Sequence, residues 1–169
     1  MNAVLDAWNN ADVADATMAM LSCCAAQRWA VQMVALRPIA NIAALSETAD
    51  QVWGAMGESD LLEAFACHPR IGERRAAAGS ERSMEWSEQE QSGTKNAPQT
   101  TMRKLVESNA LYEQRFGFAY IVCATGKSAD EMLVILERRL ASDRMAELRE
   151  AAEQQRQILQ IRLGKWLLS

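Results

Sequence analysis

The stretch that decides the fold class is FGFAYIVCA, residues 116–124. It is rich in aromatic and β-branched residues, so its composition taken alone is typical of a β-strand. The rest of the chain offers no second strand with which it could pair. The sequence therefore predicts an extended, buried connector here, and the fold class depends on what flanks it.

Helices are predicted on both sides of this connector. Pro98 suits the first turn of a helix that reaches about Arg115. After the connector, Ser128-Ala-Asp-Glu131 has the form of a capping box, which marks a helix start. Apolar residues then recur on one face of that helix, and Asp143 begins a long last helix. The second half of the chain is predicted to be helical.

The first third of the chain gives the same prediction. Apolar-rich stretches run from Val13 to Cys24 and on to Leu36, where Arg37-Pro38 marks a break. From Ile42 to Met56 the apolar residues keep a spacing of three or four. We expect an all-α fold of about seven or eight helices.

One long loop interrupts this pattern. Residues 68–84 show no sustained apolar period and contain two glycines and a proline. Ser87-Glu-Gln-Glu90, just beyond, has the form of another capping box. We expect one compact domain over residues 1–169, with this loop as the first place to look for a site, since long loops in compact domains are usually functional or disordered.

Charge and composition exclude several classes of protein. The net charge of −4 disfavours a nucleic-acid partner, because such proteins use basic surfaces to neutralise phosphates. No apolar run approaches the roughly 20 residues that span a bilayer, and the N-terminus lacks a cleavable targeting pattern. Four cysteines without a Cys-x-x-Cys pair, and one histidine, offer no tetrahedral metal set. We expect a cytoplasmic protein without membrane, metal or nucleic acid.

The single histidine, His68, is the strongest candidate for acid–base chemistry. It precedes Pro69, which keeps it out of helical geometry and holds the imidazole at a helix end. The alternative is a histidine that only caps the helix or forms a surface hydrogen bond. Cys67 could form a Cys/His pair with it, but adjacent side chains diverge and no third orienting group is apparent, so a buried thiol is favoured.

Three charged residues could complete a small-molecule site. Glu90 has a sufficient explanation as the last residue of a capping box. Arg162 falls about 60° from the centre of the apolar stripe of the last helix, so its guanidinium needs an acidic partner or an anionic ligand if it is buried. A structural ion pair, or a head that reaches water, would explain it equally well. Arg70 is either an anion contact or a solvated charge. These residues permit a site but name no reaction.

Several motifs in order resemble one known family. They are His68-Pro-Arg-Ile-Gly72, Ser87-x-x-Glu90-Gln91, Arg115-Phe-Gly-Phe118, Trp29, Arg37-Pro38 and Ile158-x-x-x-Arg162-Leu163. Together they resemble 2-oxo-4-hydroxy-4-carboxy-5-ureidoimidazoline (OHCU) decarboxylase, and the resemblance covers nearly the whole chain. The family acts in urate degradation, after urate oxidase and hydroxyisourate hydrolase.

The resemblance implies an all-helical, homodimeric carboxy-lyase that needs no cofactor and converts OHCU to (S)-allantoin. His68 matches the family's catalytic histidine, and Glu90 and Arg162 match residues that line its site. The positions that match substrate contacts are Pro69, Ser87, Gln91, Tyr120, Ile121, Val122, Cys123 and Ala124.

The chain departs from the family pattern in two places, and two other functions stay open. Ala119-Tyr120 stands where the family commonly has Pro-Phe, beside the substrate, and Ile39 stands where a phenylalanine often follows Arg-Pro. One alternative is a helical interaction module that docks a partner through the loop at His68. The other is a hydrolase of a neighbouring step; allantoin hydrolysis usually calls for a metal, whereas hydroxyisourate hydrolysis is harder to exclude on chemistry.

Overall fold

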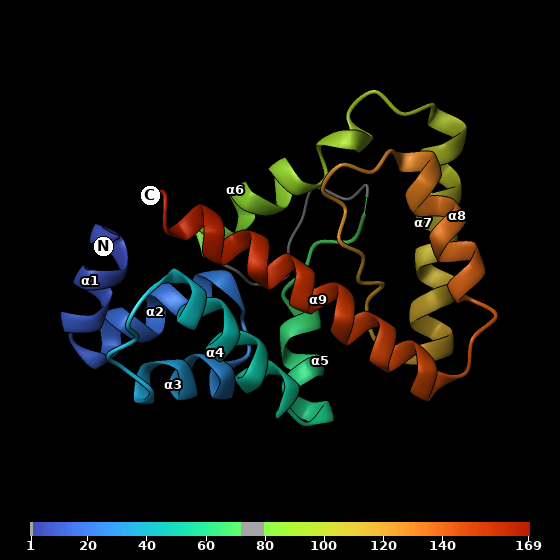
Figure 1. The fold of residues 1–169 in the computed structure, drawn as a ribbon. Helices are drawn as coiled ribbons and strands as arrows, with labels where there is room; N and C mark the ends of the chain where they lie inside the picture. Colours follow the sequence, from blue (N-terminus) through green and yellow to red (C-terminus); the bar gives the residue numbers. More distant parts are fainter. Residues whose placement is uncertain (1, 72–79) are drawn as a thin grey trace. The chain divides into compact units, whose positions relative to one another are not determined.

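The computed structural model describes residues 2–71 and 80–169, and every regular element in these two ranges is helical (Figure 1). The predicted all-α fold class is confirmed. The described residues form nine α-helices and one short 3₁₀ turn, so the expected seven or eight was too few. The helices gather into two compact units, and the single-domain organisation of residues 1–169 stays a prediction.

The first unit comprises residues 1–64 and 156–169. Its helices are α1 (Ala3–Asn10), α2 (Val13–Cys23), α3 (Gln27–Ala35), α4 (Ile42–Gly54), most of α5 (Glu58–Ala66) and the end of α9 (Arg144–Trp166). Helix α1 was not anticipated. Asn2 caps it by accepting a hydrogen bond from the backbone N–H of Leu5 at 3.0 Å.

Tryptophans fill the core of this first unit. Trp29 is fully buried and donates its indole N–H to the carbonyl of Ala49. Trp8 meets Trp166 edge-on, with ring centroids 5.9 Å apart. Arg37 stacks over the Trp8 ring and donates to the carbonyl of Trp8 at the end of α1. The Arg37-Pro38 break predicted from the sequence therefore also ties two helices together.

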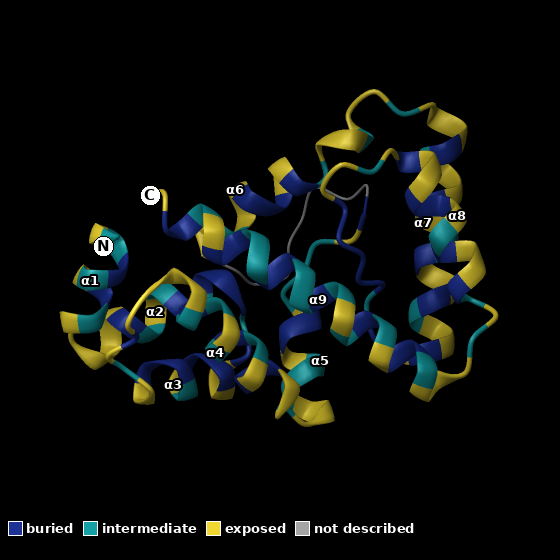
Figure 2. Ribbon diagram, viewed as in Figure 1, coloured by how far each residue is buried: buried dark blue, intermediate teal, exposed yellow. Residues whose placement is uncertain are grey.

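The second unit comprises residues 65–155. Its described helices are α6 (Glu81–Glu90), the 3₁₀ turn (Ser92–Thr94), α7 (Gln99–Phe116), α8 (Ala129–Arg139) and most of α9. Residues 118–124 between α7 and α8 are neither helix nor strand, and all of them except the half-buried Ala119 are buried, which confirms this part of the predicted connector (Figure 2). Of the two remaining predicted residues, Phe116 ends α7 and Gly117 is exposed. Gly117, in left-handed geometry with φ 80°, ends α7 and turns the chain into the connector.

The two expected capping boxes have different outcomes. The Ser128 side chain accepts from the N–H of Glu131 while the Glu131 carboxylate accepts from the N–H of Ser128, as predicted. The prediction of a capping box at Ser87 is wrong. Helix α6 begins earlier, with Ser80 as its cap, and the Ser87 hydroxyl inside the helix donates to the carbonyl of Ser83. The predicted loop of residues 68–84 therefore ends at residue 80, and its part from 72 to 79 lies outside the described residues.

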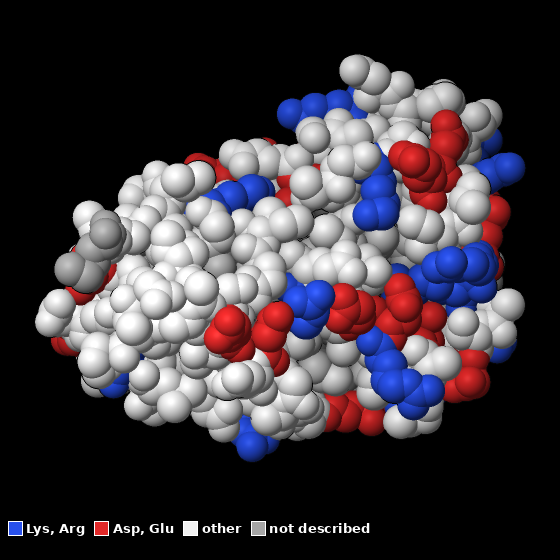
Figure 3. Space-filling model, viewed as in Figure 1, with Lys and Arg blue, Asp and Glu red and all other residues white. Residues whose placement is uncertain are grey.

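Charges of both signs intermingle on the face of the molecule that Figure 3 shows. This mixture agrees with the small net charge of −4. None of the helices in the described ranges combines the length and the hydropathy that crossing a bilayer requires.

A close backbone contact joins the 3₁₀ turn to the start of α8. A Cβ atom added at Gly93 would lie 2.1 Å from the carbonyl oxygen of Lys127, which is inside any real contact distance. The residue at position 93 must therefore lack a side chain. The contact fixes the segment that follows Glu90 against the segment that follows the connector.

We predict that Gly93→Ala lowers the free energy of unfolding by about 1–3 kcal/mol, because backbone must move to admit the methyl group. Gly164→Ala is the matched control. Gly164 lies within α9 with open space around the position of a Cβ atom, so alanine there should stabilise the protein by up to about 1 kcal/mol through helix propensity. Urea unfolding of both variants tests this, and equal stabilities would contradict it.

Candidate active site

The predicted catalytic histidine follows the end of α5. His68 is half-buried, and its backbone N–H bonds to the carbonyl of Phe65 at 3.1 Å, which closes one turn beyond the helix. The imidazole therefore belongs to a defined turn, as the His68-Pro69 dipeptide predicts. The Phe65 ring under this turn is fully buried and packs on Phe118, with centroids 5.6 Å apart.

Two contacts hold the short segment after His68. The carbonyl of Pro69 accepts a hydrogen bond of 3.4 Å from the side-chain amide of Gln91. Arg70 forms a two-point ion pair with Glu113 of α7, and its second hydrogen bond measures 2.7 Å. The sequence left two roles open for Arg70, an anion contact or a solvated charge. The structure shows a third arrangement, in which the guanidinium pairs with a carboxylate of the same chain. The segment is therefore held by Gln91, the residue that follows α6, and by Glu113 of α7.

The end of α6 brings a carboxylate close to the connector. Glu90 is the last residue of α6 and only 8% exposed. Burial raises the pKa of the Cys123 thiol, the Lys127 ammonium opposes this rise, and the Glu90 carboxylate adds to it. Glu90 and Lys127 therefore both lie within electrostatic reach of Cys123. Pro69, Gln91, Glu90 and Cys123 thus belong to one neighbourhood of the second unit.

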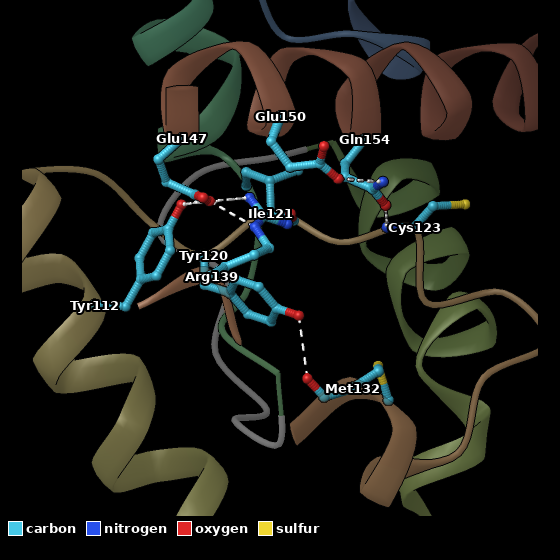
Figure 4. A network of polar contacts seen from close by, with 9 residues as sticks. All are labelled: Tyr112, Tyr120, Ile121, Cys123, Met132, Arg139, Glu147, Glu150 and Gln154. Atoms are coloured by element: carbon cyan, nitrogen blue, oxygen red, sulfur yellow. Dashed lines mark hydrogen bonds and ion pairs between the residues drawn. The ribbon is translucent and has the colours of Figure 1, made fainter. Parts of the chain in front are cut away.

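Side chains supply the hydrogen bonds that a neighbouring strand would give to the backbone of the connector. The carbonyl of Ile121 accepts from Arg139 at 2.6 Å. The N–H of Cys123 donates to Gln154 at 2.9 Å (Figure 4). The carbonyl of Cys123 accepts from the ammonium of Lys127 at 2.7 Å. These anchors satisfy buried backbone groups that would otherwise cost free energy.

Val122 lies between these two anchored residues. Its backbone N–H and C=O groups face the side of the connector opposite to those of Ile121 and Cys123. In extended chain, successive residues direct their N–H and C=O groups to opposite sides. In residues 2–71 and 80–169, no group bonds to the N–H or the carbonyl of Val122, although the residue is only 4% exposed. A buried donor and acceptor side by side form an edge that suits a ligand with the complementary pair.

A buried ion pair fixes the connector. Arg139 and Glu147 are both almost fully buried and form an ion pair, and the Tyr112 phenol donates to the same carboxylate at 2.5 Å. Figure 4 shows the Glu147 carboxylate between the Tyr112 hydroxyl and the Arg139 guanidinium. Arg139 also lies over the ring of Tyr120, 4.9 Å from its centroid, while the Tyr120 hydroxyl donates to the carbonyl of Met132. One guanidinium therefore holds both the ring and the backbone of the connector.

Burial in this cluster perturbs both tyrosines of the chain. Desolvation raises the pKa of Tyr112 far above its usual value of 10, and the Arg139 charge only partly opposes this. Desolvation raises the pKa of Tyr120 in the same way. Because both phenols stay neutral in the fold but ionise near pH 10 once unfolded, folding loses free energy as the pH rises above about 10.

We predict that the folded protein shows almost no tyrosinate absorbance at 295 nm up to about pH 11, although the chain contains two tyrosines. The absorbance should appear only as the protein unfolds, in step with the loss of helical circular dichroism. The same titration in urea provides the control, with a midpoint near pH 10. Ionisation of either tyrosine in the helical state would contradict the buried cluster.

The structure brings together some of the predicted site residues. Segment Tyr120–Ala124 is buried against Arg139 and Gln154, and Pro69 contacts Gln91. Ser87 is buried, with its hydroxyl bonded back to its own helix. His68 and Glu90 lie in the second unit, whereas Arg162, 4% exposed, lies in the part of α9 that belongs to the first. Their union in one site stays a prediction.

Three anchors of the connector were missed from the sequence: Arg139, Lys127 and Gln154. A signal existed for Arg139, which lies seven residues after Met132 and therefore on the apolar face of α8. An arginine on an apolar face was noticed at position 162 and overlooked here. Lys127 and Gln154 gave no such signal, because each lies outside an apolar stripe. Among the described residues, no three histidine, cysteine or acidic side chains gather as a metal-ligand set would.

Solved structures define the class of protein to which this fold belongs. The fold is similar to a crystal structure of OHCU decarboxylase in the presence of (S)-allantoin, with a TM-score of 0.76 and 30% identity over 88% of this chain and 96% of that one. A crystal structure of (S)-allantoin synthase shares the fold, with a TM-score of 0.72 at 16% identity. The class is that of all-helical enzymes.

Sequence comparison then gives the family. The family model of OHCU decarboxylase matches residues 9–164, and the chain belongs to this family, as predicted. The uric acid degradation bifunctional protein TTL of Arabidopsis thaliana is 33% identical over 85% of this chain, which spans 44% of that protein's length. The OHCU decarboxylase of Amia calva is 28% identical over 75% of this chain, which spans 73% of its length. Membership of this family favours an enzyme over the interaction module.

Proposed function

We propose that the protein decarboxylates OHCU to (S)-allantoin. The observation that carries this proposal is the family match over residues 9–164, which includes His68, Glu90 and Arg162. A similar structure, with 30% identity over most of the chain, is that of OHCU decarboxylase in the presence of (S)-allantoin, the product that this reaction would release. The hydrolase alternative has no such support.

The chemistry of the substrate explains why such an enzyme needs neither metal nor organic cofactor. In OHCU, the carbon that loses CO₂ carries a hydroxyl group and lies next to a ring carbon that is doubly bonded to nitrogen. When the bond to the carboxylate breaks, its electron pair forms a double bond to the neighbouring carbon, and the imine nitrogen takes up a proton. The hydroxyl then loses its proton to become a carbonyl, and the neighbouring carbon gains one. The substrate supplies its own electron sink.

Each part of the candidate site has a role in this scheme. His68 carries the proton work, either by removing the hydroxyl proton or by delivering the carbon proton on one face. Glu90 orients His68 or accepts hydrogen bonds from the ureido N–H groups. The backbone edge of Val122 offers one donor and one acceptor to a ureide or ring amide. One-sided protonation on this frame gives a single enantiomer.

The first test measures rate and stereochemistry together. OHCU is generated freshly from urate with urate oxidase and hydroxyisourate hydrolase, and circular dichroism follows allantoin formation. We expect a rapid (S)-allantoin signal with the wild type. His68→Asn should lower the rate by about 10²–10⁴-fold, since it removes the acid–base group. Equal decay to racemic product with both proteins would reject the decarboxylase proposal.

We further propose that Arg162 stabilises charge that develops in the reaction. A cation that gripped the departing carboxylate would stabilise the ground state and slow its loss. Arg162 therefore addresses a ring carbonyl oxygen or the developing negative charge.

Arg162→Ala should lower kcat by about 10²–10³-fold while KM stays close to the wild-type value. Steady-state kinetics on protein with wild-type helical circular dichroism measures this split. A changed KM with an unchanged kcat would show that Arg162 only binds the substrate.

We propose that the enzyme is a homodimer and acts in the cytoplasm. The family resemblance supports the dimer. Cys23, Cys24, Cys67 and Cys123 form no disulfide with one another in the part of the chain that the structure describes, and a reducing compartment suits such thiols.

A further inference from the structure

The side chain of Gln155 in α9 is buried without any hydrogen-bond partner. The residue is 0% exposed, and neither its amide nitrogen nor its amide oxygen meets a partner in the described ranges. The neighbouring face of the helix is apolar, since Ala151, one turn earlier, is also fully buried. An amide in such surroundings destabilises the fold, because water has been removed and nothing replaces it.

Other glutamines of the same helix show the contrast. Gln154 accepts from the N–H of Cys123 and donates to Glu150. Gln160 donates to the carbonyl of Ser46 and accepts from its hydroxyl. Both are only half-buried, and both have partners. Gln155, the most deeply buried of these three glutamines, is therefore the one without partners in the described ranges. Buried polar groups normally have hydrogen-bond partners, so this pattern indicates that a ligand supplies them.

Gln155 belongs to the turn of α9 that contacts the connector through Gln154. It belongs to the same compact unit as His68, Glu90 and the connector. The residue before it, Gln154, holds the backbone of Cys123 at 2.9 Å, so this turn of α9 lies against the connector (Figure 4). The connector in turn carries Val122, whose backbone has no hydrogen-bond partner among the described residues.

We propose that Gln155 is a substrate-binding residue of this enzyme, and that its amide pairs edge-on with a ureide or ring amide of the substrate. A primary amide presents a donor and an acceptor side by side, and the N–H and C=O of a ureide present the complementary pair. This inference rests on the proposed function. It adds a residue that discriminates ureides from acids or alcohols, because a ligand without this pair leaves the buried amide unsatisfied.

The test replaces the amide with a side chain of equal length. In Gln155→Met, the unpaired donor and acceptor are removed, so the Tm without ligand should rise by about 2–6 °C. The KM for freshly generated OHCU should rise about tenfold, since two hydrogen bonds to the substrate are lost. The rise in Tm that (S)-allantoin causes in the wild type should disappear. A purely structural amide would not combine a more stable protein with weaker binding.

Gln157→Met is the matched control, with the same substitution on another face of α9, where the side chain is half-buried. It should keep the wild-type KM and the wild-type response to (S)-allantoin. A KM for Gln155→Met within about twofold of the wild type would overturn the inference, whatever its Tm, because an amide that held only water would give that result. If Gln155→Met does not fold, Gln155→Leu takes its place, and failure of both to fold would also overturn the inference.

Failure of the proposed function would be recognised separately. If the wild type does not accelerate OHCU decay, the decarboxylase proposal fails, and the response of Tm to (S)-allantoin decides about Gln155. Loss of that response in Gln155→Met alone would still support Gln155 as a ureide-binding residue. The same response in both proteins, or none in the wild type, would overturn it.

Discussion

The buried contact between Arg139 and Glu147 is the constraint on which the second unit depends. An isolated buried charge is strongly unfavourable, and a paired one often stabilises no more than an apolar pair of the same size. Burial alone would lower the pKa of Arg139, but the hydrogen bond to Glu147 and the electrostatic attraction of Tyr112, Glu147 and Tyr120 together outweigh it, so the pKa is raised and the guanidinium stays charged. The ion pair matters because it fixes the orientation of the groups around it: a planar guanidinium has several donors in a fixed arrangement. One donor holds the carbonyl of Ile121, and the ring of Tyr120 lies under the same group.

The same arrangement explains how the backbone of the connector is satisfied without a β-sheet. An extended segment without a sheet must satisfy its backbone by other means. Here, α8 supplies Arg139, the loop before it supplies Lys127, and α9 supplies Gln154. All three act on one side of the segment, at Ile121 and Cys123. The side chains thus satisfy the backbone on that side as a neighbouring strand would, and on the other side nothing among residues 2–71 and 80–169 bonds to the backbone of Val122.

The sequence predicted features that depend on local chemistry. The helix start at Ser128 follows from a capping box, and the connector follows from a strand-like composition without a strand to join. The start of α6 was wrong, because Ser-x-x-Glu occurs inside helices as well as before them, and no local signal tells Ser87 from a cap. The Arg139–Glu147 pair joins residues from two helices, so only tertiary structure reveals it. Gln155 is a polar residue on the apolar stripe of the last helix, but only the structure shows that its amide has no partner in the described ranges.

A rigid polar frame matters more for this chemistry than for most. A substrate with its own electron sink can lose CO₂ without an enzyme, so the protein has little bond-breaking to perform. What it can add is a fixed orientation, which decides the face that receives the proton. Fixed donors and acceptors in a dry site also need no reorganisation as charge moves through the substrate. In the part of the chain that the structure describes, the backbone of Val122 and the amide of Gln155 have no hydrogen-bond partner, and stabilisation elsewhere must offset this cost. The tryptophan core of the first unit and the aromatic cluster around Tyr112 supply apolar burial of the kind that offsets such a cost.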